Sequence, residues 1–153
     1  MKRLLKKLGI LALILLLLTA FCACGSTDDS SVSEVHSGLD YNGAYTSAED
    51  VSLYLLQYGE LPGNFITKNE ARALGWEGGS LEKYAPGCCI GGDRFGNYEG
   101  LLPEKEGRRY FECDINTLGK SSRGAERLVF SSDGLIYYTQ DHYESFELLY
   151  GEE

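Results

Sequence analysis

Few side chains of this sequence are suited to proton transfer near neutral pH. The chain has two histidines, His36 and His142, and histidine is the side chain whose ordinary pKa lies closest to neutrality. His36 lies in a polar stretch without apolar periodicity, so we expect it to be inert. His142 lies between Asp141 and Tyr143 near the end of the chain, and it is the candidate acid or base.

A carboxylate candidate for the same chemistry lies in the alternating run at residues 109–115. Successive side chains of an extended strand point to opposite faces. The two faces are formed by Phe111, Cys113 and Ile115 and by Tyr110, Glu112 and Asp114. The apolar face is expected to meet the helices, so the pattern predicts that Glu112 lies on the open face of a sheet.

Three cations are candidates for holding an anion. Lys68 lies in the first turn of a predicted helix, where a cation opposes the helix dipole at a cost of roughly a few tenths of a kcal/mol. That cost favours a functional reason for the residue. Arg123 and Arg127 are the other two cations, and the alternative for them is simple pairing with Glu126 or other acids.

The elements that position these residues follow from local signals. Ser47 and Asp50 predict a helix start, and Gly59 with Pro62 predicts its end. Thr67 to Glu70 predicts a second start, and residues 80–84 one further short turn of helix. Beyond Gly87 the period changes to two, and strands are predicted at residues 88–90, 109–115, 128–131, 135–139 and 146–149. This order predicts an α+β fold in which N-terminal helices pack on a five-stranded antiparallel sheet.

The amino terminus has the pattern of an export signal. A basic head of Lys2, Arg3, Lys6 and Lys7 precedes an apolar run at residues 8–18, which is short for a membrane span. Small residues then surround Cys24, as at a bacterial lipoprotein cleavage site, although Phe21 stands where leucine is usual. We predict a signal peptide at residues 1–24 and lipidation of Cys24, with ordinary secretion as the alternative. Either route places the domain outside the cytoplasm, touching a membrane only through the lipid.

Removal of the signal makes the protein strongly acidic. Residues 25–40 are polar and predicted to be a flexible linker, and residues 41–153 are enough for one domain. Four of the 14 Lys and Arg lie in residues 1–7, while all 23 Asp and Glu follow Cys24. The mature chain therefore has ten cations against 23 acids, a net charge of −13. Long-range repulsion then disfavours polyanions, so nucleic-acid binding would require a local cationic site.

Three cysteines remain in the predicted domain, namely Cys88, Cys89 and Cys113. An exported protein meets an oxidising compartment, so a bridge from Cys88 or Cys89 to Cys113 is one alternative and three free thiols are the other. Their spacing matches no zinc site.

A series of ordered motifs connects these observations. They are Leu61-Pro-x-Asn64, Ile66-Thr-Lys68, Ala73-Leu-Gly-Trp76, Ala85-Pro-Gly87, Ile90-Gly-Gly-Asp93, Asn97-x-Glu-Gly100, Asp114-Ile-Asn116, Ser131-Ser-Asp133 and Asp141-His-Tyr143. The stretch from Leu61 to Phe146 resembles the barnase-type guanyl-preferring ribonucleases of bacteria, within the microbial ribonuclease superfamily. The fold of that family, helices against a five-stranded antiparallel sheet, agrees with the fold predicted above.

The resemblance implies an endoribonuclease that needs no metal or cofactor. In the family reaction the ribose 2′-OH attacks its own phosphate and leaves a 2′,3′-cyclic phosphate. By motif, Glu112 matches the general base and His142 the general acid. Lys68, Arg123 and Arg127 match the cations that hold the phosphate, with a loop before Arg123 that is one residue longer than usual.

The resemblance also implies how the base is bound. Gly96, Asn97, Tyr98 and Glu99 match the guanine-binding loop, in which Glu99 accepts hydrogen bonds from guanine N1–H and the amino group, and Tyr143 matches an aromatic packed against the substrate. Tyr98 stands where the family commonly has Arg, and Leu101, directly after Gly100, stands where it commonly has Lys. Less positive charge therefore surrounds the site.

The partners implied are single-stranded RNA and, from the family alone, a barstar-like inhibitor, with the protein itself a monomer. The charge of −13 keeps a second function open, a cell-surface binding module that retains the fold without turnover.

Overall fold

The computed structural model describes residues 38–153. The predicted signal peptide and most of the predicted linker, with Cys24 and His36, lie outside the described residues. The elements are helices α2 (Ala48–Tyr58) and α3 (Lys68–Ala73) and strands β1 (Phe65–Ile66), β2 (Cys89–Phe95), β3 (Tyr110–Asp114), β4 (Arg127–Ser131), β5 (Ile136–Thr139) and β6 (Glu147–Tyr150). In this part of the chain no helix is long and apolar enough to cross a membrane.

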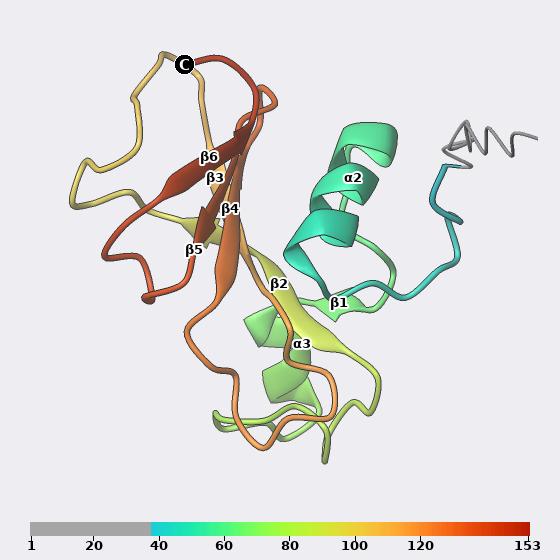
Figure 1. Cartoon of the computed structure of the whole chain (residues 1–153). Helices are drawn as coiled ribbons and strands as arrows, with labels where there is room; N and C mark the ends of the chain where they lie inside the picture. Colours follow the sequence, from blue (N-terminus) through green and yellow to red (C-terminus); the bar gives the residue numbers. More distant parts are fainter. Residues whose placement is uncertain (1–37) are drawn as a thin grey trace, which may run out of the picture. The chain divides into compact units, whose positions relative to one another are not determined.

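The strands form one sheet in chain order, from β1 to β6 (Figure 1). The pairs from β2 to β6 are antiparallel, which confirms the predicted α+β fold. The predicted count of five strands is wrong, because β1 adds a sixth that runs parallel to β2. Two residues are too few to show a period in the sequence, so the pattern gave no sign of this strand.

Strand β2 is longer than the predicted strand, which ended at Ile90. It continues through Gly91 and Gly92 to Phe95, with a bulge between Gly91 and Asp93. A side chain at Gly91 would lie 2.6 Å from atoms of Cys113 and Phe65, and Gly92 has a φ of 89°. The two glycines therefore serve close packing and a bulge inside a strand, and not the turn that their type suggests.

Both described helices begin at the predicted signals, and α2 also ends at its predicted glycine. The Ser47 hydroxyl accepts from the N–H of Asp50 at 3.0 Å, and Gly59 closes α2 in the left-handed region with a φ of 75°. Thr67 and Glu70 form a reciprocal capping box at the start of α3. Leu39, within the predicted linker, already bonds through its backbone to the Gln57 side chain on α2.

The predicted short turn of helix at residues 80–84 is present as an isolated hydrogen-bonded turn and not as a regular helix. The N–H groups of Tyr84 and Ala85 both donate to the carbonyl of Leu81 at 2.9 Å, which makes a turn that Pro86 and Gly87 stop from continuing.

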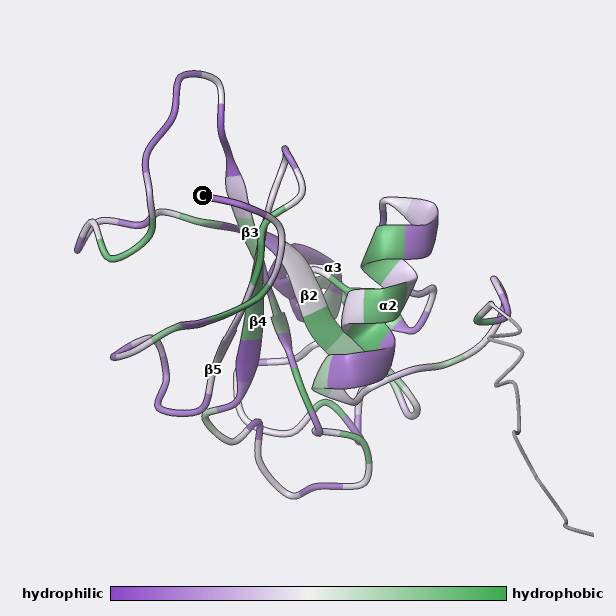
Figure 2. Ribbon diagram, turned by 45° about the horizontal axis from the view of Figure 1, so that its top comes forward, coloured by the Kyte–Doolittle hydropathy of each residue, from purple (hydrophilic) through white to green (hydrophobic). Residues whose placement is uncertain are grey.

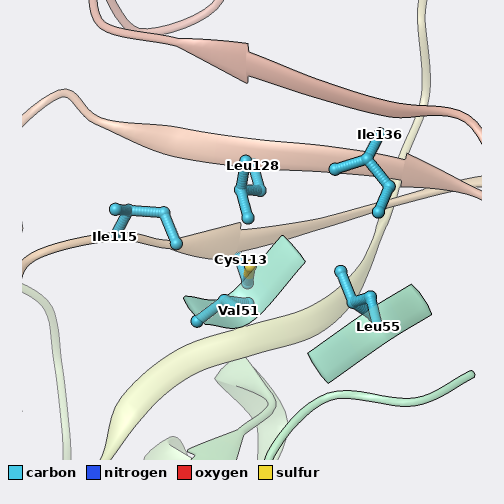
Figure 3. Close-up of a cluster of buried hydrophobic side chains, with 6 residues drawn as sticks. All are labelled: Val51, Leu55, Cys113, Ile115, Leu128 and Ile136. Carbon is cyan, nitrogen blue, oxygen red and sulfur yellow. The ribbon is translucent and has the colours of Figure 1, made fainter. Parts of the chain in front are cut away.

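One face of the sheet packs against α2. The buried cluster on this face consists of Val51, Leu55, Cys113, Ile115, Leu128 and Ile136 (Figure 3). In Figure 2 the hydrophobic colour runs along the central strands and part of α2, whereas the connecting loops are mostly hydrophilic or neutral. The prediction that Cys113 and Ile115 meet the helices is therefore confirmed.

The opposite face is covered as well. The connection between β2 and β3 and that between β5 and β6 project on the side away from α2 (Figure 1). They close over a second cluster formed by Leu102, Tyr110, Val129, Leu135 and Tyr137. Glu112 therefore lies on the face away from α2, as predicted, but loops cover most of this face, since Glu112 is 7% exposed and Asp114 is 1% exposed.

The three cysteines are free thiols, so the alternative of a disulfide is not realised. Cys113 lies opposite Gly91 in the sheet, whereas Cys89 lies two residues further along and faces Phe65. Burial raises the pKa of Cys89, and it raises that of Cys113 well above its usual value. Both thiols remain protonated and act as small apolar core residues.

Candidate active site

A cavity of about 620 Å³ opens on the face of the sheet away from α2. Its walls come from the start of α3, the end of β2 with the following loop, β3, the loop at Arg123 and the turn after β5. The lining residues are Lys68, Arg94, Phe95, Gly96, Asn97, Tyr98, Glu99, Leu101, Glu112, Arg123, His142, Tyr143 and Glu144. The structure thus brings together every candidate of the predicted ribonuclease site except Arg127.

Glu112 lies in the middle of β3, between Asp93 on β2 and Val129 on β4. One carboxylate oxygen accepts from the Lys68 ammonium and the other from the Tyr143 hydroxyl. The carboxylate is therefore held in one orientation by two donors from opposite sides of the cavity. A base fixed in this way reaches a substrate proton without a search among rotamers.

Lys68 is placed by the N-terminus of α3, of which it is the first residue. Its backbone N–H donates to Asp93 at 2.8 Å, so a carboxylate on β2 binds the free end of the helix. The ammonium pairs with Glu112, and this contact gives a reason for a lysine at the unfavourable end of the helix dipole. The motif match included Asp93, but this role for it was missed from the sequence.

The arginines are organised by Asp114, a second residue without a role in the sequence analysis. Two hydrogen bonds, of 2.6 Å and 2.8 Å, run from the guanidinium of Arg123 to its two carboxylate oxygens. Nε of Arg127 lies 2.9 Å from Asp114 Oδ1 as an ion pair without hydrogen-bond geometry. The guanidinium of Arg123 also lies 5.6 Å from the ring centre of Trp76. These contacts fix Arg123 at the edge of the cavity.

Arg127 is buried behind the cavity and does not line it. Its side chain is 2% exposed, and its two terminal nitrogens donate to the carbonyls of Arg123, Gly124 and Glu126. Burial lowers the pKa of this guanidinium, although an arginine remains charged at neutral pH. The contacts of Arg127 therefore stabilise the loop that carries Arg123.

The turn after β5 presents His142 and Tyr143. Both have a positive φ, of 59° and 77°, which is uncommon for residues other than glycine and is often found at functional sites. Asp141 holds the turn by accepting from Ser145 and Thr139, and these hydrogen bonds lower its pKa to about 2. The exposed His142 ring lies 4.9 Å from the Tyr143 ring, centre to centre.

The loop after β2 holds the candidate base-binding residues. The Asn97 side chain donates to the carbonyl of Leu102 at 2.9 Å and accepts from its N–H at 3.0 Å. This pair of bonds closes the loop, so the Asn97 side chain braces the loop from inside. Glu99 and Tyr98 project outward, with Tyr98 95% exposed. Beneath them Phe95 packs 5.2 Å from Tyr143, centre to centre.

Comparison with known proteins assigns this arrangement to a family. The family model described as ribonuclease matches residues 48–150, which contain every helix and strand found within residues 38–153. The chain belongs to the ribonuclease family. It is an RNA-cleaving enzyme, as the resemblance implied, and the alternative of a binding module without turnover is set aside.

Individual ribonucleases support the same assignment. A ribonuclease of Bacillus intermedius is 44% identical over 123 residues, which cover 79% of this chain and 75% of that protein. A ribonuclease of Heyndrickxia coagulans is 52% identical over 100 residues, covering 64% of this chain and 91% of the relative. The guanyl-specific ribonuclease St of Saccharopolyspora erythraea is 44% identical over 57 residues, covering 37% of this chain and 56% of its own length.

Proposed function

We propose that this ribonuclease cleaves RNA after guanosine, outside the cytoplasm, with Glu112 as general base and His142 as general acid. The observation that carries the proposal is that these two residues, from β3 and from the turn after β5, line one cavity together with Lys68 and Arg123. A base, an acid and cations around one space are what transfer of a phosphoryl group within RNA requires.

The reaction follows from the positions of the groups. The 2′-hydroxyl of the guanosine displaces the Tyr143 hydroxyl from Glu112, loses its proton to the carboxylate and attacks phosphorus. The bond from phosphorus to the 5′-oxygen of the next nucleotide breaks, and the His142 imidazolium gives that oxygen its proton. The products are a 2′,3′-cyclic phosphate and a free 5′-hydroxyl. Lys68 and Arg123 stabilise the additional negative charge on the phosphorus oxygens in the transition state.

Glu99 supplies the preference for guanine in this proposal. Its exposed carboxylate stands on a loop that Asn97 braces. Guanine offers N1–H and an amino group to one carboxylate, whereas adenine offers no such pair of donors. A relative named as guanyl-specific aligns with part of this chain, which supports the same preference.

We expect cleavage of GpA to be about 10- to 100-fold more efficient than cleavage of ApA, because a carboxylate left unpaired by the wrong base costs about 1–3 kcal/mol. Glu99→Gln is expected to reduce this ratio, and Glu144→Gln, which changes another carboxylate of the cavity, to preserve it. The measurement is kcat/KM on the two dinucleotides. Equal values for the native protein would contradict the role of Glu99.

The location of the enzyme rests on its first residues. The basic head, the apolar run and Ala23-Cys24-Gly25 support export and acylation of Cys24, and such anchors hold a protein firmly when more than one acyl chain is attached. We expect mass spectrometry of the mature protein, purified from membranes, to show lipid on the Cys24 residue at its amino terminus. An unmodified mature chain in the medium would instead establish ordinary secretion.

A further inference from the structure

A second cavity, of about 450 Å³, adjoins the active site. It shares the segment from Arg94 to Asn97 with the active-site cavity. Its other walls come from residues 104–106 and 108–110, in the connection from β2 to β3 and at the start of β3. The two cavities therefore meet at the end of β2 and the first residues of the following loop.

Four cationic side chains line the second cavity, and two of them have no carboxylate partner within residues 38–153. Lys105 and Arg108 pair with Asp133, at 3.4 Å and 2.9 Å. Within residues 38–153, Arg94 and Arg109 form no ion pair and no side-chain hydrogen bond, and both are exposed. The three cations of the predicted catalytic set, by contrast, all lie against carboxylates.

Hydrogen bonds to the Pro103 carbonyl hold the loop that lines this cavity. The Tyr110 hydroxyl and the Arg108 guanidinium both donate to the carbonyl of Pro103, at 2.8 Å and 3.0 Å. The Arg108 side chain is also almost fully buried. The loop that lines the cavity therefore keeps its shape, and it offers a preformed surface beside the two exposed arginines.

We propose that Arg94 and Arg109 form a binding subsite for a phosphodiester of the RNA strand outside the linkage that is cleaved. A guanidinium is well suited to bind a phosphate, because two of its coplanar N–H groups can donate to two phosphate oxygens at once. The predicted mature chain has a net charge of −13. Two arginines in one cavity that have no partner within residues 38–153 are a local exception to its general repulsion of RNA. The subsite rests on the proposed function, because the RNA reaches it from the active site.

Two carboxylates, Glu104 and Glu106, line the same cavity and oppose this binding. Substitution of the arginines and substitution of the carboxylates should therefore change RNA binding in opposite directions. Removal of the arginine charges weakens the binding of a strand that reaches the cavity, and removal of the carboxylate charges strengthens it.

The test compares two variants that lose the same charge. Arg94→Gln with Arg109→Gln removes the subsite, and Lys83→Gln with Lys120→Gln removes two exposed lysines that do not line the cavity. The probe is a fluorescent 2′-O-methyl oligonucleotide of nine residues with one central guanosine, which cannot be cleaved because it lacks the 2′-hydroxyl. Versions shortened on the 5′ side or on the 3′ side show which flank is held.

We expect the arginine variant to weaken binding of the nine-residue probe about tenfold and the lysine variant to change it by less than about twofold. The slope of log affinity against log salt should become shallower by about 0.7 for each phosphate lost. Glu104→Gln with Glu106→Gln should tighten binding. Both arginine effects should vanish on the probe shortened at the flank that occupies the cavity.

Cleavage of GpA tests the proposed function without involving the second cavity. The dinucleotide is too short to fill the second cavity, so Arg109→Gln alone, which leaves the lining of the active-site cavity unchanged, should retain the native kcat/KM on GpA. Equal weakening of the nine-residue probe by the arginine and lysine variants, or no weakening by either, would overturn the subsite. Failure of the native protein to cleave GpA would instead contradict the proposed function.

Discussion

Replacement of Glu112 with glutamine lowers kcat for RNA by about 10²–10⁴-fold, the usual contribution of a positioned group that transfers a proton. The amide has nearly the same shape as the carboxylate, and its oxygen still accepts from Lys68 or Tyr143, so the fold is expected to remain. Its nitrogen, however, takes no proton from a 2′-hydroxyl. The measurement is initial velocity on GpA and on yeast RNA, with circular dichroism to verify the fold.

His142→Gln is expected to cause a loss of similar size, and the pH profiles separate the two roles. A base must be deprotonated, so its loss removes the fall in rate on the acidic side of the profile. An acid must be protonated, so its loss removes the fall on the alkaline side. Glu144→Gln, which alters a neighbouring carboxylate of the cavity, is the matched control. Turnover near the native level in either the Glu112 or the His142 variant, with contamination excluded, would contradict the assignment.

The sequence was informative where local chemistry decides the structure. Ser47 and Thr67 cap helices because a side-chain oxygen meets the free N–H groups of the first turn, and that signal extends over only three residues. The alternation at residues 109–115 placed Cys113 and Ile115 toward α2, since the two-residue period of an extended segment is a local property of its backbone. Such features are confirmed by the structure.

The sequence was less informative where distant segments meet. Alternation shows which side chains share a face but not what covers that face, and so Glu112 was expected on an open surface. Arg127 matched a motif, yet its guanidinium turns inward to the carbonyls of its own loop. The contacts of Asp93 and Asp114 depend on the bulge in β2 and on the path of the loop before β4. Neither leaves a periodic signal in the chain.

Asp114 contacts residues from other segments, so we expect Asp114→Asn to lower the free energy of unfolding more than any other substitution considered above. Asp114 and Arg127 have side chains that are each 2% exposed, and Arg123 also bonds to the carboxylate. Loss of this charge leaves a buried guanidinium without its counter-ion, which costs about 3–5 kcal/mol of unfolding free energy.

Urea unfolding at neutral pH measures the loss. Glu77→Gln is the control, because this carboxylate is exposed and forms no ion pair within residues 38–153. A second substitution, Arg127→Met, should restore part of the stability lost in Asp114→Asn, because it removes the unpaired charge. If Asp114→Asn costs no more than Glu77→Gln, the buried ion pair does not stabilise the fold around the active site.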